Sequence, residues 1–165
     1  MKRKLLLMLA VVAGSVVFAA GLYAATTVKD VIQMENKAYA SHKKGIATFS
    51  HKKHMEEYAT QNPELYKKGC GECHHDKDNK PLTLKAGDDV QNCIECHKKP
   101  GESPKGKDAP KLSDKEKMEY HAEAIHANCK GCHKAFNTAK NSKAAPVTCT
   151  KCHPKKGKDD KEDAE

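Results

Sequence analysis

One short pattern occurs four times in this chain: two cysteines separated by two residues and followed at once by a histidine. The copies are CGECH at 70–74, CIECH at 93–97, CKGCH at 129–133 and CTKCH at 149–153. They use all eight cysteines of the chain, so no thiol is left over. Two thiols and an imidazole at this spacing can attach a haem covalently through thioether bonds and supply a ligand to its iron.

Two other uses of paired cysteines compete with this interpretation. A small exported chain could close four disulfides, and paired CxxC units could build two zinc sites of four cysteines each. Neither use requires a histidine after every pair, whereas covalent haem attachment does. The sequence therefore predicts four c-type haems, numbered 1 to 4 in chain order. Their attachment residues are Cys70 and Cys73, Cys93 and Cys96, Cys129 and Cys132, and Cys149 and Cys152, and the proximal iron ligands are His74, His97, His133 and His153.

The remaining histidines can supply the second axial ligand of each iron. There are six of them: His42, His51, His54, His75, His121 and His126. Because four irons need four such ligands, every haem can have two histidines. His42 is expected to be an exposed surface residue.

Spacing narrows the choice among these six histidines. His51 and His54 are three residues apart, so on a helical turn they lie at neighbouring points of one face and should reach two different haems. His75 directly follows His74, and consecutive side chains point in different directions on any regular backbone. We therefore expect His75 to reach a haem other than the one that His74 binds.

Residues 113–126 are predicted to form one helix. Ser113 with Glu116 three residues later matches a capping box, and His121 and His126 both flank the apolar stripe of the helix. Periodicity does not choose between these two histidines. We favour His126 as the ligand because it lies three residues before Cys129.

The composition indicates what must form the core. The chain has 165 residues, of which 32% are charged and 5% aromatic, and much of its apolar content lies in the first 25 residues. Side chains this polar bury too little apolar surface to offset chain entropy, so we expect the porphyrins to form the core. The predicted fold is mostly α and irregular, a small multihaem fold with few short helices and one short β-hairpin near residues 45–50, wrapped round four haems. Residues 26–39 are expected to be a short helix or a spacer.

The N-terminus is predicted to direct export. MKRK is followed by an uncharged apolar run over 5–25 that ends in small residues, which is typical of a secretory signal peptide. The run is also long enough to span a bilayer, so an uncleaved membrane anchor is the alternative. We expect the functional part to be periplasmic. Removing Lys2, Arg3 and Lys4 with this segment lowers the formal charge from +8 to 8 − 3 = +5, which is not the basic stripe of a nucleic-acid binder.

The rest of the chain is expected to be connective. After the signal peptide (1–25), an N-terminal extension (26–44) precedes the haem domain (45–154), and a charged, disordered tail (155–165) follows it. Residues 98–111 contain three prolines and are expected to be a flexible surface linker between haems 2 and 3.

The ordered set of motifs resembles the class III cytochromes c, the tetrahaem cytochrome c3 family of sulfate- and metal-reducing bacteria. FSHKKH at 49–54, CGECHH at 70–75, the three further CxxCH sites and the YH…IH segment carry the resemblance over residues 45–154. It implies that His51 is the distal ligand of haem 1, His75 of haem 2, His54 of haem 3 and His126 of haem 4. The chain departs from many members in having two residues, and never four, between each pair of cysteines.

Two histidines on every iron leave no position for a substrate, so the expected function is one-electron transfer at low potential, without enzymatic activity. By resemblance, the partners would be a hydrogenase, a formate dehydrogenase or a membrane redox complex. Contact with the membrane is expected only if the N-terminal segment is retained. Lysines 130, 134, 151, 155 and 156 flank haems 3 and 4 and could dock an acidic partner. The alternatives are a small reductase of metal ions or sulfur oxyanions and a subunit of an extracellular electron-conducting assembly.

Overall fold

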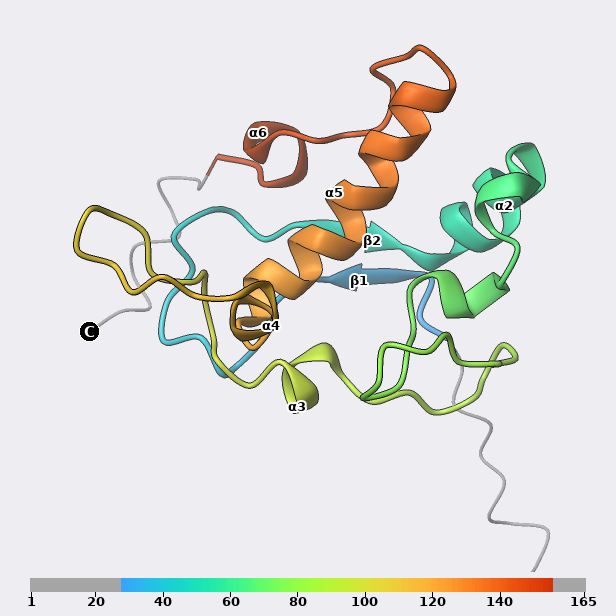
Figure 1. The fold of residues 1–165 in the computed structure, drawn as a ribbon. Helices are drawn as coiled ribbons and strands as arrows, with labels where there is room; N and C mark the ends of the chain where they lie inside the picture. The colour runs from blue at the N-terminus through green and yellow to red at the C-terminus, as the bar shows by residue number, and fades with distance from the viewer. Residues whose placement is uncertain (1–27, 156–165) are drawn as a thin grey trace, which may run out of the picture. The chain divides into compact units, whose positions relative to one another are not determined.

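The computed structural model describes residues 28–155 (Figure 1). Residues 29–85 and 90–155 belong to one compact unit, which contains all four CxxCH motifs. The predicted signal peptide and most of the charged tail lie outside the described residues. None of the helices in the described range is long and apolar enough to cross a membrane.

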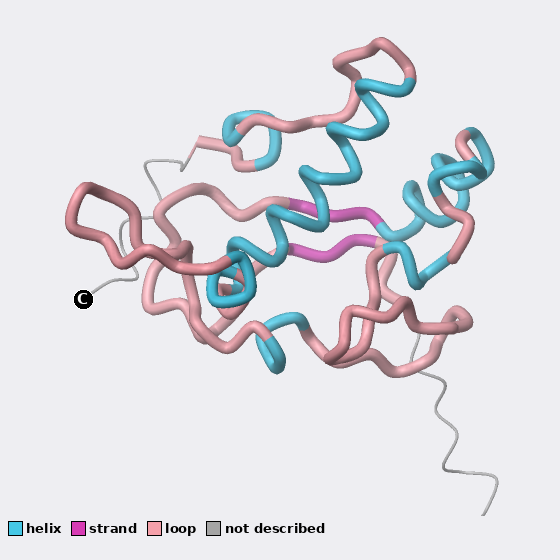
Figure 2. The backbone as a smooth tube through the Cα atoms, in the orientation of Figure 1, coloured by secondary structure: helices cyan, strands magenta, loops and turns pink. Residues whose placement is uncertain are grey.

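The described chain is mostly loop, with short helices and one small sheet (Figure 2). The strands are β1 (Val31–Gln33) and β2 (Thr48–Ser50). The helices are η1 (Lys53–Tyr58), α2 (Ala59–Gln61), η2 (Pro63–Leu65), η3 (Gly69–Glu72), α3 (Cys93–Cys96), α4 (Asp114–Lys117), α5 (His121–Ala139) and α6 (Cys149–Cys152). The prediction of a small irregular fold with few short helices and one strand pair is therefore confirmed.

The two strands correct the prediction for residues 26–39. Of these residues, 28–39 are described, and they contain a strand in place of a helix or spacer: Val31–Gln33 pairs antiparallel with Thr48–Ser50, with Ile32 opposite Phe49. Strand β2 lies in the region of the predicted hairpin, and a long loop separates it from its partner β1. His51 continues the pairing by donating its backbone N–H to Asp30 O at 2.8 Å. The sheet thus fixes the backbone from which His51 and His54 project.

Helical backbone follows β2 directly. Residues 51–61 are helical, and η1 within them is a π-helix, a form that often occurs at functional sites. The N–H of Lys53 donates to the Ser50 hydroxyl at 3.2 Å, which gives one of the free N–H groups at the helix start a partner.

The single helix predicted over 113–126 is wrong, because the structure has two helices there. The capping box at Ser113 is confirmed: its hydroxyl accepts from Glu116 N at 3.3 Å, and its own N–H donates to the Glu116 carboxylate at 2.7 Å. Helix α4 ends at Lys117, and Tyr120, the residue before α5, has extended dihedrals (φ −85°, ψ 120°). Tyr120 is extended because the backbone on either side of it pairs with Lys99, whose N–H donates to Glu119 O (2.9 Å) and whose carbonyl accepts from His121 N (2.8 Å).

Residues 99–105 are held against the start of α5, which corrects the expectation of a flexible linker for this part of 98–111. The Ala122 N–H donates to Gly101 O at 3.1 Å, and the Ser103 hydroxyl donates to the Glu123 carboxylate at 2.7 Å. Lys105 lies 2.9 Å from Glu102 and 3.8 Å from Glu123. The turn at Gly101 needs glycine, because its φ of 88° is one that other residues rarely adopt.

Side chains alone do not form a core. Among the described residues no hydrophobic side chain is buried, and His121, at 8% relative exposure, is the one buried polar residue. A folded chain normally gains most of its stability by burying apolar surface. The fold therefore depends on another apolar body against which its half-exposed side chains can pack, as the composition predicts.

Candidate haem-ligand sites

Each CxxCH motif folds as a single helical turn. In three of them the histidine N–H donates to the carbonyl of the first cysteine: His74 to Cys70 (2.9 Å), His97 to Cys93 (2.8 Å) and His153 to Cys149 (2.7 Å). The remaining motif, 129–133, lies inside α5. Residues at positions i, i+3 and i+4 of a helical turn share one face. Two thiols and one imidazole are thus presented on the same side in every motif.

In the described part of the chain, no disulfide joins one CxxCH motif to another. All eight are free thiols, and within residues 28–155 no three His, Cys, Asp or Glu side chains gather as a set of metal ligands. Cys73 keeps solvent access, but surrounding chain crowds its thiol, and this burial raises the pKa to about 11. Burial likewise raises the pKa of the Cys93 and Cys129 thiols. Before haem attachment, these thiols are therefore protonated at neutral pH.

Every proximal histidine lies beside one of the histidines considered as distal ligands. The ring centres are 6.4 Å apart for His51 and His74, 6.0 Å for His75 and His97, 6.3 Å for His54 and His133, and 6.1 Å for His126 and His153. The ring planes are nearly parallel in the His51 pair (18°) and the His54 pair (22°). They are steeply inclined in the His75 pair (69°) and the His126 pair (88°).

This separation fits a metal ion between two imidazoles. An imidazole nitrogen lies about 2 Å from the metal it binds, so two rings on opposite sides of one ion have centres about 6 Å apart. In the two nearly parallel pairs, rings in direct face-to-face contact would have closer centres than this, whereas edge-to-face contact also gives about 6 Å. All four pairs thus have the spacing that a shared ion requires, and the proximal histidine of each directly follows a CxxC pair.

The pairs connect parts of the chain that are distant in sequence. His51 and His54, at the start of one helix, face the histidines of the first and third motifs respectively. Helix α5 carries His126 as well as His133, so it takes part in two of the pairs. Adjacent residues His74 and His75 face different partners, as their opposite directions predict.

Backbone carbonyls orient most of these imidazoles. In six of the eight rings, Nδ1 forms a hydrogen bond with a backbone carbonyl oxygen. The pairs are His51 with Lys29 (3.0 Å), His54 with Ser50 (2.8 Å), His75 with Asp76 (2.8 Å), His133 with Pro146 (2.7 Å), His153 with Gly45 (2.9 Å), and His97 with Met118. A carbonyl oxygen only accepts, so Nδ1 must carry the hydrogen and Nε2 keeps a lone pair for a metal. Such contacts fix the tautomer and orientation of ligand histidines and raise their basicity.

Comparison with protein families agrees with this geometry. The class III cytochrome c family model matches residues 25–160 of the chain. The chain belongs to the class III cytochrome c family. Membership makes it a small multihaem electron-transfer cytochrome that binds c-type haem covalently. The match begins at residue 25 and so takes in residues 26–44, beyond the span of 45–154 on which the sequence resemblance rests. A comparison with curated proteins finds no match.

The residues of this class III cytochrome fit the haem that the family binds. Three features support this fit. Each motif presents its two thiols and its imidazole on one face, and an imidazole pair with ring centres about 6 Å apart lies at each motif. Within residues 28–155, no hydrophobic side chain is buried. Burial lowers the pKa of His54, His74 and His126 below the ordinary value. These imidazoles are therefore neutral at neutral pH, the form in which a histidine binds a metal.

His121 and His42 have other neighbours in the cytochrome. The buried His121 ring holds the Tyr39 hydroxyl at 2.8 Å through Nδ1, and its ring centre is 5.6 Å from that of Tyr39. We expected His42 to be an exposed residue. It is instead half-buried, and its ring stacks on that of Tyr39 with the ring centres 5.2 Å apart. Sequence reasoning overlooked Tyr39 altogether, because nothing in the local pattern of residues 36–42 indicates a contact with α5.

A surface pocket adjoins the fourth motif. It is lined by Lys43, Lys44, Gly45, Cys149, Thr150, His153, Pro154 and Lys155. Lysines from two distant segments thus meet beside His153. Lys156, also named among the predicted docking residues, lies outside the described residues.

Proposed function

We propose that this class III cytochrome binds four c-type haems, each held by two histidines, and carries electrons singly between proteins of the periplasm. The observation that carries the proposal is the set of four imidazole pairs about 6 Å apart, one at each CxxCH motif. When bound, haem iron supplies reversible one-electron oxidation and reduction. The protein supplies the attachment, both axial ligands and the surroundings.

The proposed ligand sets pair a proximal with a distal histidine at each iron. They are His74 with His51 for haem 1, His97 with His75 for haem 2, His133 with His54 for haem 3 and His153 with His126 for haem 4. Two ligands on each iron leave no position for a substrate, which favours an electron carrier over a reductase. The carbonyl contacts at Nδ1 support low potentials, since a more basic imidazole stabilises the oxidised metal.

The shared elements support rapid exchange of electrons within the protein. His51 and His54 are one helical turn apart, so they tie the sites of haems 1 and 3 to one another. His74 and His75 tie the sites of haems 1 and 2, and α5 ties those of haems 3 and 4. We propose that these ties make the four sites a single relay.

The proposed partners are acidic redox proteins. The resemblance implies a hydrogenase, a formate dehydrogenase or a membrane redox complex. Lys43, Lys44 and Lys155 around the pocket beside His153 support docking by opposite charge, which would be weak and sensitive to salt. Membrane attachment is proposed only for a form that keeps residues 1–25.

Carbon monoxide and a potentiometric titration together test the proposal. Carbon monoxide binds reduced haem only where an axial position is open or weakly held, so the reduced protein should show no more than trace binding. The titration should give one-electron steps that together account for four haems, all at low potential. Binding of carbon monoxide by a substantial part of the haem would contradict the carrier and favour the reductase.

A further inference from the structure

The loop that follows His75 folds back onto the first haem motif. Within residues 75–82, the Asp76 N–H donates to Lys80 O at 2.9 Å. The Leu82 N–H then donates to His74 O, also at 2.9 Å. The loop is therefore a closed unit that begins and ends at the motif, and His75 is its first residue.

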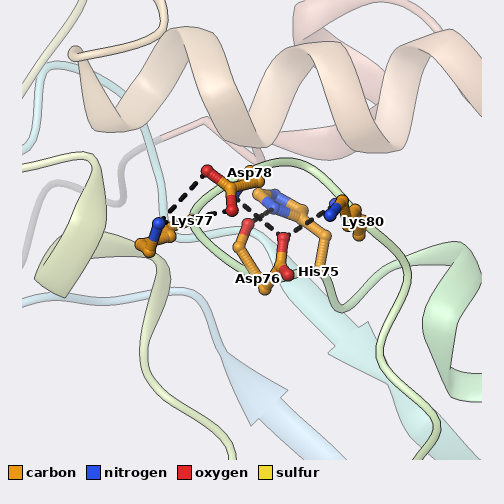
Figure 3. Close-up of polar contacts among 5 residues, drawn as sticks. All are labelled: His75, Asp76, Lys77, Asp78 and Lys80. Atoms are coloured by element: carbon orange, nitrogen blue, oxygen red, sulfur yellow. Dashed lines mark hydrogen bonds and ion pairs between the residues drawn. The ribbon is translucent and has the colours of Figure 1, made fainter.

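The carboxylate of Asp76 holds the interior of this loop together (Figure 3). Its Oδ1 accepts the backbone N–H groups of Asp78 and Lys80, each at 2.9 Å. The Asp76 carbonyl in turn accepts from Asn79 N at 3.0 Å and from His75 Nδ1 at 2.8 Å. The side chain and the backbone of one residue thus close the turn and orient the His75 ring.

His75 differs from the proximal histidines in what holds it. The Nδ1 atoms of His133 and His153 donate to carbonyls of distant segments, Pro146 and Gly45. The His75 residue is exposed, and its ring is held by the carbonyl of the very next residue. Its direction therefore depends on the shape of the local loop, which Asp76 determines.

We propose that Asp76 is a positioning residue that directs His75 toward the iron opposite His97. The inference rests on the proposed function, in which His75 is the distal ligand of haem 2. Asp76 does not touch the metal; it fixes the carbonyl that holds Nδ1 of His75 and leaves Nε2 free to bind. The role is geometric and depends on the acceptor oxygen of the side chain, not on its negative charge.

Three substitutions separate geometry from charge. Asp76→Asn keeps an oxygen that accepts the two N–H groups but removes the charge. Asp76→Ala removes both. Asp78→Ala is the matched control, since the Asp78 carboxylate belongs to the same loop and makes only an exposed ion pair with Lys77 at 3.2 Å. His75→Ala gives the signal of a lost distal ligand.

The test is carbon monoxide binding by the reduced, fully haem-loaded proteins, with intact mass as a check on haem content. We expect His75→Ala to make one haem reactive and Asp76→Ala to make the same haem partly reactive, several-fold above the wild-type level. Asp76→Asn and Asp78→Ala should match the wild type.

Two results would overturn the inference while leaving the proposed function in place. One is a wild-type response of Asp76→Ala beside a reactive His75→Ala. The other is an Asp76→Asn protein as reactive as Asp76→Ala, which would assign the effect to charge. If His75→Ala itself stays unreactive, His75 is not a ligand, and the proposed ligand set fails first.

Discussion

The rings of His126 and His153 lie 6.1 Å apart with their planes inclined by 88°. His126 lies in the first half of α5, and His153 follows α6, so two separate elements meet to form this pair. His121, another histidine of the same helix, is buried against Tyr39. Helix α5 therefore places His121 and His126 beside different neighbours.

Exchanging each of these histidines for methionine should have different effects. His126→Met replaces an imidazole that we propose as an iron ligand, so the potential of one haem should rise by a fraction of the roughly 0.8 V range that axial ligands cover. His121→Met is the matched control, from the same helix and equally conservative in size. It should leave all potentials and haem spectra unchanged. Potentiometry with visible spectra measures both.

The opposite outcome would reassign the ligand. If His121→Met alters one haem and His126→Met alters none, then His121 ligates the iron and the spacing of the His126 pair has another cause.

Gly45 is expected to tolerate no side chain. A Cβ at this position would lie 2.3 Å from Pro154 O, and the Gly45 carbonyl also holds His153 Nδ1 at 2.9 Å. Gly45→Ala should therefore push the two segments apart, destabilise the holoprotein by about 1–3 kcal/mol and loosen the His153 site. The thermal midpoint and carbon monoxide binding measure the two effects.

Gly131→Ala is the control for this substitution. Its Cβ would meet nothing within 4 Å, and in a helix interior alanine is favoured over glycine by about 0.5–1 kcal/mol. The variant should be as stable as the wild type or slightly more stable. A Gly45→Ala protein with unchanged stability and spectra would show that the close approach to Pro154 is not needed.

The lysines beside His153 should affect the rate at which a partner binds. Lys44→Glu reverses one charge at the pocket, so association with an acidic redox partner should slow severalfold at low ionic strength, and the difference should shrink as salt is added. Lys115→Glu makes the same change in charge at an exposed position of α4 and should slow association much less. Stopped-flow reduction at two ionic strengths measures both. Equal rates for the two variants would place docking elsewhere.

The contact between Ser103 and Glu123 should make stability depend on pH. The Ser103 hydroxyl donates to Glu123 at 2.7 Å and, more than any other contact, holds the pKa of that carboxyl below its ordinary value. Because the folded pKa is lowered, the unfolded chain takes up the proton more readily. The contact therefore stabilises the fold above the ordinary carboxyl pKa of about 4.3 and loses this effect as the pH falls through the folded pKa.

Ser103→Ala should accordingly lower the free energy of unfolding at pH 7 by about 1–2 kcal/mol. The difference from the wild type should shrink as the pH falls below about 4. Ser41→Ala, at an exposed serine, should show no difference at either pH. Thermal melts at pH 7 and at a pH below about 4 measure the difference between each variant and the wild type. A Ser103→Ala difference that stays constant with pH would mean that the contact does not act through the charge of Glu123.

The haem attachment sites can be predicted from the sequence because covalent attachment requires fixed residues at a fixed spacing. The one-turn shape of each CxxCH motif and the divergence of His74 and His75 follow from local geometry. The proximal histidine that each distal histidine faces does not follow from local geometry, because it depends on how distant segments pack. The resemblance to a family supplied the pairs, and the structure brings the same rings together.

Backbone groups account for most of what sequence reasoning overlooked. Any residue has a carbonyl, so the sequence cannot indicate that those of Gly45 and Pro146 hold imidazoles. The break at Tyr120 likewise arises from pairing with Lys99, a contact that overrides a continuous helical pattern. Of these features, only the close approach at Gly45 leaves a trace in the sequence, because it requires a residue without a side chain.

The central claim is that four haems are attached through the eight cysteines, and intact mass tests it most directly. The purified, secreted protein should exceed the mass of its polypeptide by four haems under denaturing conditions, because thioether bonds survive unfolding. Changing both Cys149 and Cys152 to alanine should lower that number by one. A mass that fits two zinc ions or four disulfides, with no haem retained after denaturation, would contradict the account.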